Sequence, residues 1–290
     1  MRLMDGVRLA VGTLSVFPVR VERVDRQVAG RAMTLAPAVG LVLGLVAGLP
    51  LLLPAPPLLG AALAVGLLAL LTRGLHLDGL ADLADGLGSG KPADQALGIM
   101  KKSDIGPFGV MTLVFTLLVQ VAAVAEAGYW ALVTACVAGR LALVWACRAG
   151  VPAARPEGLG AMVAGTVRRS AAWLVTLGTA LTAVAIGLLA DVWSGVPGDV
   201  SWWPEPVPAS TEVYGMVRTF PTDAERIVGE VGGWLSGPAG APIALLAGTG
   251  VALLLLRHAR RRLGGITGDV LGALVETATA AALVAWALFP

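Results

Sequence analysis

Three aspartates with helical spacing are the residues of this sequence best suited to bind a metal. Asp78, Asp82 and Asp85 stand at i, i+4 and i+7 in the sequence HLDGLADLADG. On an α-helix these positions fall within about 60° of arc and along about 10 Å of the axis. Carboxylates at this spacing repel one another, and a bound cation would relieve the repulsion. Because Mg²⁺ takes oxygen ligands from one or two carboxylates, water and phosphates, the spacing predicts a Mg²⁺ site for a phosphate-containing substrate, with Asp82 as its catalytic member.

A solvated acidic helix face is the alternative interpretation, but the surrounding residues favour a phosphate site. Small residues among and after the aspartates allow close approach of the backbone: Gly79, Gly86, Gly88 and Gly90. Lys101, Lys102 and Asp104 follow just before the next apolar segment. The two lysines can neutralise a diphosphate, and Asp104 is a further candidate for substrate binding. His76 lies about 160° around the helix from Asp78, so we expect it to face away.

A second polar group occurs in GGITGDVLGALVE near the C-terminus. Gly265 and Gly268 belong to a flexible backbone on which a phosphate can rest, and Asp269 stands at the edge of the following apolar segment. Glu276 lies about 10 Å deeper on the same helix face, and Arg140 occupies a comparable depth in another apolar segment. Charged residues inside a span are costly and are usually paired or functional. We therefore expect an ion pair between Arg140 and Glu276, or two groups that line one polar cavity for substrate.

The elements that must position these residues are predicted by composition to lie in a membrane. The chain has 290 residues, of which 57% are hydrophobic and 14% are charged, and its mean hydropathy is +0.81. These values exclude an ordinary soluble domain. Gly40, Gly44 and Gly48 form a stripe of small residues typical of helix packing in lipid. We expect one all-α integral membrane domain over residues 1–290, a polytopic bundle of transmembrane helices.

Apolar segments long enough to cross a bilayer recur along the whole chain. We expect seven spans, at residues 33–53, 58–72, 107–125, 130–148, 171–190, 242–256 and 270–289. Residues 1–32 would then be an amphipathic cytosolic segment, residues 73–106 the cytosolic Asp-rich segment, and residues 191–241 an external loop. On this assignment only Arg218 and Arg226, among the basic residues of the loops, lie outside. The asymmetry predicts a cytosolic N-terminus and a cytosolic site.

The motifs, in their order along the chain, resemble the cobalamin synthase family, the adenosylcobinamide-GDP ribazoletransferases. The resemblance covers most of the chain and rests on the sequences LSVFPV, HLDGLADLADG, MKKSDIGPFG, AGRLAL, RPEGLG and GGITGDVLGA. Residues 191–241 are longer and more polar than the family pattern, and nothing is carried over to them.

This resemblance implies a Mg²⁺-dependent enzyme of the prokaryotic cytoplasmic membrane, active on its cytosolic side. The ribose 3′-hydroxyl of α-ribazole, or of its 5′-phosphate, would attack the corrinoid-side phosphorus of adenosylcobinamide-GDP and release GMP. The three aspartates of HLDGLADLADG would hold the metal, and Lys101 and Lys102 would neutralise charge on the leaving GMP. Asp269 would serve as a further metal ligand or as the base for the attacking hydroxyl.

Two other functions stay open at this point. A CDP-alcohol phosphotransferase also uses helical aspartates and Mg²⁺, but no arginine follows Asp78 and Gly79 as its motif requires. An ion-coupled transporter would place its carboxylates near the middle of the bilayer, whereas these aspartates gather at one surface. Besides its substrates we expect membrane lipid as a partner, no nucleic acid, and a chain compatible with a homo-oligomer.

Overall fold

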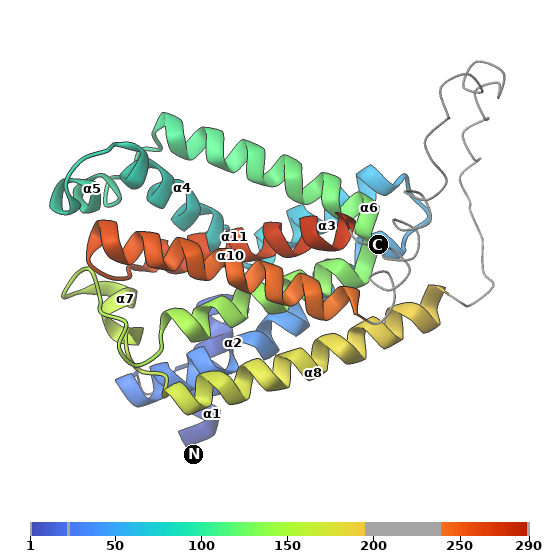
Figure 1. Ribbon diagram of the computed structural model, residues 1–290, viewed down its shortest axis with the longest axis horizontal. Helices are drawn as coiled ribbons and strands as arrows, with labels where there is room; N and C mark the ends of the chain where they lie inside the picture. Colours follow the sequence, from blue (N-terminus) through green and yellow to red (C-terminus); the bar gives the residue numbers. More distant parts are fainter. Residues whose placement is uncertain (1, 22–23, 195–238, 289–290) are drawn as a thin grey trace, which may run out of the picture.

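The computed structural model describes residues 2–21, 24–194 and 239–288, and within these ranges every regular element is a helix (Figure 1). The all-α prediction is therefore confirmed. Most of residues 191–241, the predicted external loop, lie outside the described residues. The helices are α1 Arg2–Leu14, α2 Arg26–Ala47, the 3₁₀ helix η1 Leu49–Leu52, α3 Pro57–Leu71, α4 Leu75–Gly88, α5 Ala93–Ile99, α6 Pro107–Ala146, α7 Gly158–Val163, α8 Arg169–Ser194, α10 Gly240–Leu263 and α11 Gly268–Leu288.

The long helices form an apolar bundle of membrane-spanning dimensions. Five helical segments of the described chain are long and apolar enough to cross a bilayer, or six if α3 and α4 together form one broken span. α11 lies at the centre, packed on α6, α10 and α4. Each predicted span overlaps one of these helices, and two of them, 107–125 and 130–148, overlap α6. The predicted polytopic membrane bundle is thus confirmed, with α2 and α10 extending beyond the predicted ends.

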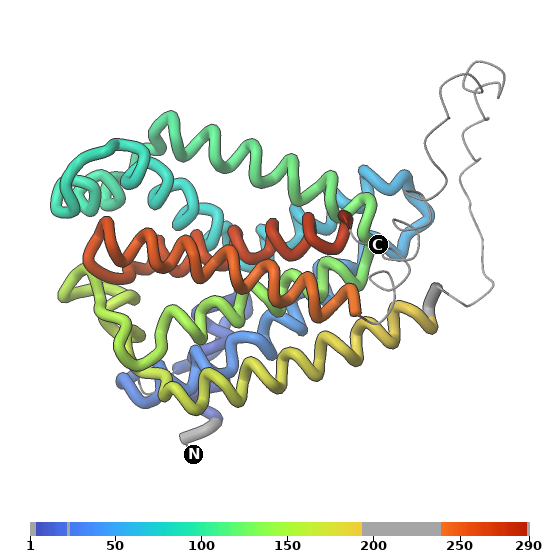
Figure 2. Tube along the Cα trace, viewed as in Figure 1, coloured from blue at the N-terminus to red at the C-terminus, as the bar shows by residue number. Residues whose placement is uncertain are grey.

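α6 contains two consecutive spans separated by a sharp break. A straight helix of its 40 residues would be about 60 Å long, twice the thickness of the hydrocarbon core of a bilayer. Gly128 interrupts it with φ 75° and ψ −161°, a conformation that only glycine adopts readily. Figure 2 shows α6 crossing the bundle and then turning back, with its second half returning toward the end from which the first half came. This reversal brings Pro107 and Ala146, the two ends of α6, to the same end of the molecule.

α4 carries the aspartate motif and is not itself a span. α3 has 15 residues, or about 22 Å of helix, and α4 turns away from it by 88°. With only 14 residues, α4 is too short to cross a bilayer. It packs against α11 and leads into α5 at one end of the bundle, where α7 also lies (Figure 1). We call this end, formed by α4, α5, α7 and the connection between α10 and α11, the polar end.

Arginines join the segments of the polar end by donating to backbone carbonyl oxygens. Arg26, at the start of α2, donates to Ala161 and Ala164 around the end of α7, at 2.6 Å each. Arg260 and Arg262 in the last turn of α10 donate at 3.3 Å to the carbonyls of Gly150 and Lys91. Segments distant in sequence, which the distribution of charges predicted to share one side, are therefore in contact.

The predicted glycine stripe of α2 is a helix-packing surface. A Cβ on Gly40 would lie 2.5 Å from the carbonyl oxygen of Cys136 in α6. The Cβ of an alanine at Gly44 would lie 2.8 Å from the Cα of Val133. Small residues at these positions let the two backbones approach closely, as the sequence predicted.

We expect Gly40→Ala to lower the free energy of unfolding by about 2 kcal/mol, because α2 and α6 must separate to admit the methyl group. Gly178→Ala in α8 is the matched control, since a Cβ on Gly178 would meet no neighbouring atom of the described chain within 4 Å. Thermal unfolding in detergent, followed by helical circular dichroism, measures both. Equal stability of the two variants would contradict the close packing of α2 on α6.

Candidate active site

α4 packs tightly against the beginning of α11, and this contact brings the two predicted acidic groups together. A Cβ on Gly79 would lie 2.8 Å from the carbonyl oxygen of Asp269, and one on Gly272 would lie 3.0 Å from the carbonyl oxygen of His76. Glycine on both helices therefore allows the backbones to touch. The HLDGLADLADG and TGDVLGA motifs, far apart in sequence, form one site.

A cavity of about 280 Å³ opens beside this contact. We call it the deep cavity. Asp78 and Asp269 line it, together with Arg155 and Thr267, and residues of α1, α2, α6 and α7 also contribute to the lining. Asp78 is exposed and Asp269 is half-buried. Two carboxylates from two helices thus face a space large enough for a small molecule.

Asp82 does not line the deep cavity, but it lies close enough to Asp78 and Asp269 for their negative charges to act on it. Its pKa is raised to about 6, first by burial and then by neighbouring negative charges. These charges belong to Asp78, Asp269 and Asp85, in decreasing order of effect. The carboxylates therefore repel one another as their spacing on α4 predicted, and a divalent cation would remove this repulsion.

Asp85 has a structural role that its spacing did not predict. Its carboxylate is buried and accepts hydrogen bonds from the backbone N–H groups of Gly106, at 2.7 Å, and Gly109, at 2.9 Å. These residues begin α6, where the first N–H groups of a helix lack partners within the helix. Asp85 therefore caps α6 from α4, with each oxygen already engaged by an amide. This arrangement favours a capping role for Asp85, and its role as a metal ligand stays a prediction.

Within the described part of the chain, no three His, Cys, Asp or Glu side chains are close enough to form a metal centre by themselves. Asp78, Asp82 and Asp269 nevertheless fit a cation that takes few protein ligands. Mg²⁺ commonly takes only one or two carboxylates and completes its shell with water and phosphate oxygens. The carboxylates present are thus compatible with Mg²⁺ shared with a phosphate substrate.

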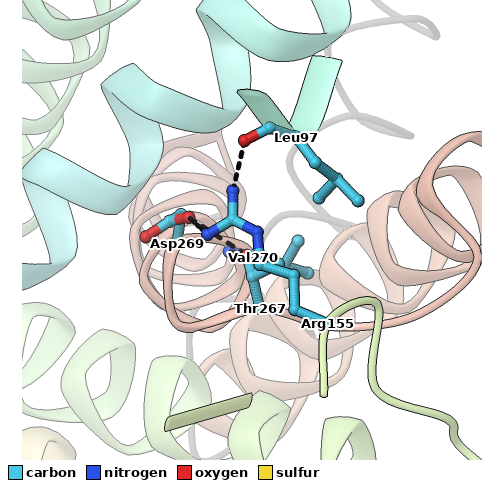
Figure 3. A network of polar contacts seen from close by, with 5 residues as sticks. All are labelled: Leu97, Arg155, Thr267, Asp269 and Val270. Atoms are coloured by element: carbon cyan, nitrogen blue, oxygen red, sulfur yellow. Dashed lines mark hydrogen bonds and ion pairs between the residues drawn. The ribbon is translucent and has the colours of Figure 1, made fainter. Parts of the chain in front are cut away.

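Arg155 connects the acidic site to α5 (Figure 3). Its guanidinium donates a hydrogen bond of 2.5 Å to the carbonyl oxygen of Leu97, and its Nη1 lies 3.8 Å from Oδ2 of Asp269. The hydroxyl of Thr267 also donates to Asp269, at 3.2 Å, and accepts from the N–H of Val270 at 3.2 Å. Asp269 is therefore held at the start of α11 while one side of it stays open to the deep cavity.

A second cavity, of about 470 Å³, adjoins the deep cavity at the surface. We call it the surface cavity. Lys101, Asp94 and Leu97 line it, and Arg155 and Glu157 line both cavities. Lys101 is thus near the site, as the sequence predicted. Lys102 and Asp104 are exposed and line neither cavity, so the structure gives no support to their predicted roles.

The two glycines predicted to carry a phosphate have separate roles. Gly268 lines the deep cavity. Gly265 is buried where two loops cross, and a Cβ on it would lie 2.5 Å from the carbonyl oxygen of Pro152. The neighbouring Ile266 exchanges backbone hydrogen bonds with Pro152 and Ala154. Gly265 therefore serves loop packing, and the geometry gives no support to its predicted contact with substrate.

The expected ion pair between Arg140 and Glu276 is not formed. Glu276 instead accepts a hydrogen bond of 2.8 Å from the side chain of Gln120, in the first half of α6. Arg140 is buried, and its Nε and Nη2 have no hydrogen-bond partner among the described residues. Neither residue lines the deep or the surface cavity. Their predicted substrate-binding role is therefore not supported by the geometry.

His76 also departs from the expectation. It is buried and contributes to the lining of the deep cavity beside Asp78, although the spacing predicted that it would face away. Neither ring nitrogen has a hydrogen-bond partner among the described residues. The deep cavity lies across the packing contact between α4 and α11, so residues from more than one face of α4 reach it.

Sequence reasoning about single helices missed Arg155, Glu157 and Thr267. RPEGLG stands out in the sequence only as a motif, and Thr267 stands inside GGITGDVLGA without an expected role. One signal was available in the sequence, because a charged side chain is costly near apolar segments. Arg155 stands between two such segments, beside Pro156 and glycines, where a loop can fold back over the site. Its contact with Asp269 joins positions more than 100 residues apart, which spacing along one helix cannot reveal.

The fold and the site define a class of protein: a polytopic integral membrane protein with an acidic, phosphate-compatible cavity at one end. Comparison with known proteins is more specific. The sequence profile described as cobalamin-5-phosphate synthase matches residues 6–287. The chain belongs to this family.

Relatives match over nearly their full length. The adenosylcobinamide-GDP ribazoletransferase of Frankia casuarinae is 41% identical, over 99% of this chain and 95% of its own. The proteins of the same name from Nocardioides sp. and Corynebacterium efficiens are each 36% identical, covering 98% and 97% of this chain and 99% and 90% of their own. No solved structure matches the chain significantly.

Proposed function

We propose that this protein is an adenosylcobinamide-GDP ribazoletransferase, which joins adenosylcobinamide-GDP to α-ribazole or its 5′-phosphate with release of GMP. Membership of the family along the whole chain supports this activity. The observation that carries the proposal is the meeting of Asp78 and Asp269 in one cavity, because this contact unites two motifs of the family in a site suited to phosphate chemistry.

The reaction is a displacement at phosphorus. The ribose 3′-oxygen of ribazole forms a bond to the corrinoid-side phosphorus, and the bond from that phosphorus to the bridging oxygen of the diphosphate breaks. GMP leaves with the electron pair, and the hydroxyl proton passes to a base. Catalysis of such a step depends on positioning and on charge stabilisation.

Asp78, Asp82 and Asp269 are the carboxylates that would hold Mg²⁺. When bound, the ion would neutralise the diphosphate and the charge that develops on the leaving oxygen. Asp269 is oriented by Thr267 and Arg155, and its open side faces the cavity, which suits it to accept the hydroxyl proton or to bind metal. Lys101 and Arg155, which line the surface cavity, would bind phosphate oxygens of GMP.

We infer that the protein spans the cytoplasmic membrane with its polar end on the cytosolic side. Basic residues lie in its segments and at the adjoining ends of α8 and α10: Lys91, Lys101, Lys102, Arg155, Arg168, Arg169, Arg257, Arg260, Arg261 and Arg262. Positive charge of this kind marks the cytosolic side of membrane proteins. Corrinoid and nucleotide substrates would then reach the site from the cytosol.

Purified protein in detergent, supplied with adenosylcobinamide-GDP, α-ribazole phosphate and Mg²⁺, tests the proposal. Chromatography should detect GMP together with an equal amount of the joined corrinoid product. Omission of either substrate should leave no product. A well-folded protein that releases no GMP would refute the proposed activity, and cation flux in liposomes would point to a transporter.

A further inference from the structure

The deep cavity differs in chemistry between its interior and its mouth. Leu14, Met33, Leu143 and Leu271 are each at most 5% exposed, and all line it. They come from four segments: the end of α1, α2, the second half of α6 and α11. The interior wall of the cavity is therefore largely aliphatic, with His76 and Thr267 as its buried polar members, and it is assembled from most of the bundle.

The mouth carries the charged residues. Asp78 and Glu157 are exposed, and the side chains of Arg155 and Asp269 are 19% and 24% exposed. A ligand that fills the cavity must therefore have an apolar part that enters first and a polar part that stays near the carboxylates.

The volume restricts which part of the two substrates can enter. At about 280 Å³, the cavity is near the lower limit of pockets that enclose small molecules. A corrinoid ring with its side chains is too large for it. A ribazole, which is a benzimidazole riboside, and the guanosine part of the other substrate are the fragments of suitable size.

Polar groups distinguish these two fragments. The guanine of guanosine carries a carbonyl, an amino group, one ring N–H and two further ring nitrogens that accept hydrogen bonds, and burial of these groups against leucines without partners is unfavourable. The benzimidazole of ribazole has one free ring nitrogen and is otherwise apolar. The buried lining offers few polar side chains, of which His76 has two ring nitrogens without partners among the described residues.

Resting on the function proposed above, we infer that the deep cavity is the ribazole subsite. The aromatic base lies among Leu14, Met33, Leu143 and Leu271. The ribose then lies at the mouth, where its hydroxyls meet Asp78 and Asp269. Adenosylcobinamide-GDP approaches from the side of Arg155 and the surface cavity, so the two substrates meet at the carboxylates.

Two cysteine variants test this assignment without depending on turnover. Leu159 lines only the deep cavity and Leu97 only the surface cavity, so Leu159→Cys and Leu97→Cys form a matched pair. The native Cys136 and Cys147 are buried, and their labelling in the unmodified chain provides the background rate. Each variant is treated with a small thiol reagent in the presence of α-ribazole, GMP or neither.

We expect α-ribazole, at ten times its half-saturating concentration, to slow labelling of Leu159→Cys about tenfold and to leave Leu97→Cys within twofold. Helical circular dichroism and the thermal unfolding temperature of each variant, compared with those of the unmodified chain, verify that it is folded. Protection of Leu159→Cys by GMP instead of α-ribazole, or no protection by α-ribazole, would overturn the assignment. The proposed function and the subsite assignment can fail independently. If α-ribazole protects Leu159→Cys but the unmodified chain does not join the two substrates, the proposed function is refuted and the subsite assignment is not.

Discussion

Replacement of Asp82 by asparagine is expected to lower the rate of GMP release about a thousandfold or more. The substitution removes the charge at the centre of the group formed with Asp78 and Asp269, and with it several kcal/mol of stabilisation of a bound cation and of the transition state. Rates measured over a range of Mg²⁺ concentrations should also show that the variant requires more metal. Chelation of divalent cations should abolish the activity of the unmodified enzyme, and added Mg²⁺ should restore it.

Glu126→Gln is the matched control for this experiment. Glu126 is an exposed carboxylate beside the break in α6, at the end of the bundle remote from the site. It should retain full activity and the same dependence on Mg²⁺. If Asp82→Asn kept its rate within tenfold at every Mg²⁺ concentration, Asp82 would not belong to the catalytic machinery.

Asp85→Ala is expected to destabilise the protein by about 3 kcal/mol, because two hydrogen bonds between a buried carboxylate and the backbone of α6 are lost. Asp85→Asn retains one acceptor oxygen and should lose about half as much. The free energy of unfolding in detergent, measured by denaturant titration, gives both values. Activity should fall with the loss of folded protein.

The control is Asp94→Ala, which removes an exposed carboxylate from the neighbouring helix α5 and should change stability by less than about 0.5 kcal/mol. The two roles considered for Asp85 give opposite results. If Asp85→Ala were as stable as the unmodified chain but had lost its response to Mg²⁺, Asp85 would be a metal ligand and not a helix cap.

Those features of the fold that depend on local composition could be predicted from the sequence. Apolar length predicted the spans, and the glycine spacing in α2 predicted a packing face, because both depend on residues adjacent on one helix. The reversal at Gly128 was implied by two predicted spans separated by a short connection. The 88° turn between α3 and α4 had no comparable signal, since it depends on contacts with α11 and α1.

The site could be predicted only in part for the same physical reason. Helical spacing predicted that Asp78 and Asp82 lie near each other, but it could not distinguish a carboxylate that faces a cavity from one that caps another helix. Asp85 is oriented by hydrogen bonds from the backbone N–H groups of Gly106 and Gly109, which follow α5 in the chain and fold back onto α4. Arg155 and Glu276 likewise find their neighbours through tertiary packing, in Asp269 and Gln120 respectively.

The arginines of the polar end have a consequence for how this enzyme tolerates changes of ionic strength. Arg26, Arg260 and Arg262 are bonded to carbonyl oxygens, which carry no net charge. Salt weakens attraction between exposed ions much more than hydrogen bonds to neutral acceptors. The scaffold of the site is therefore largely independent of the electrolyte, whereas capture of an anionic nucleotide and of the proposed divalent ion would not be. Salt should thus act on substrate capture while the architecture around the carboxylates persists.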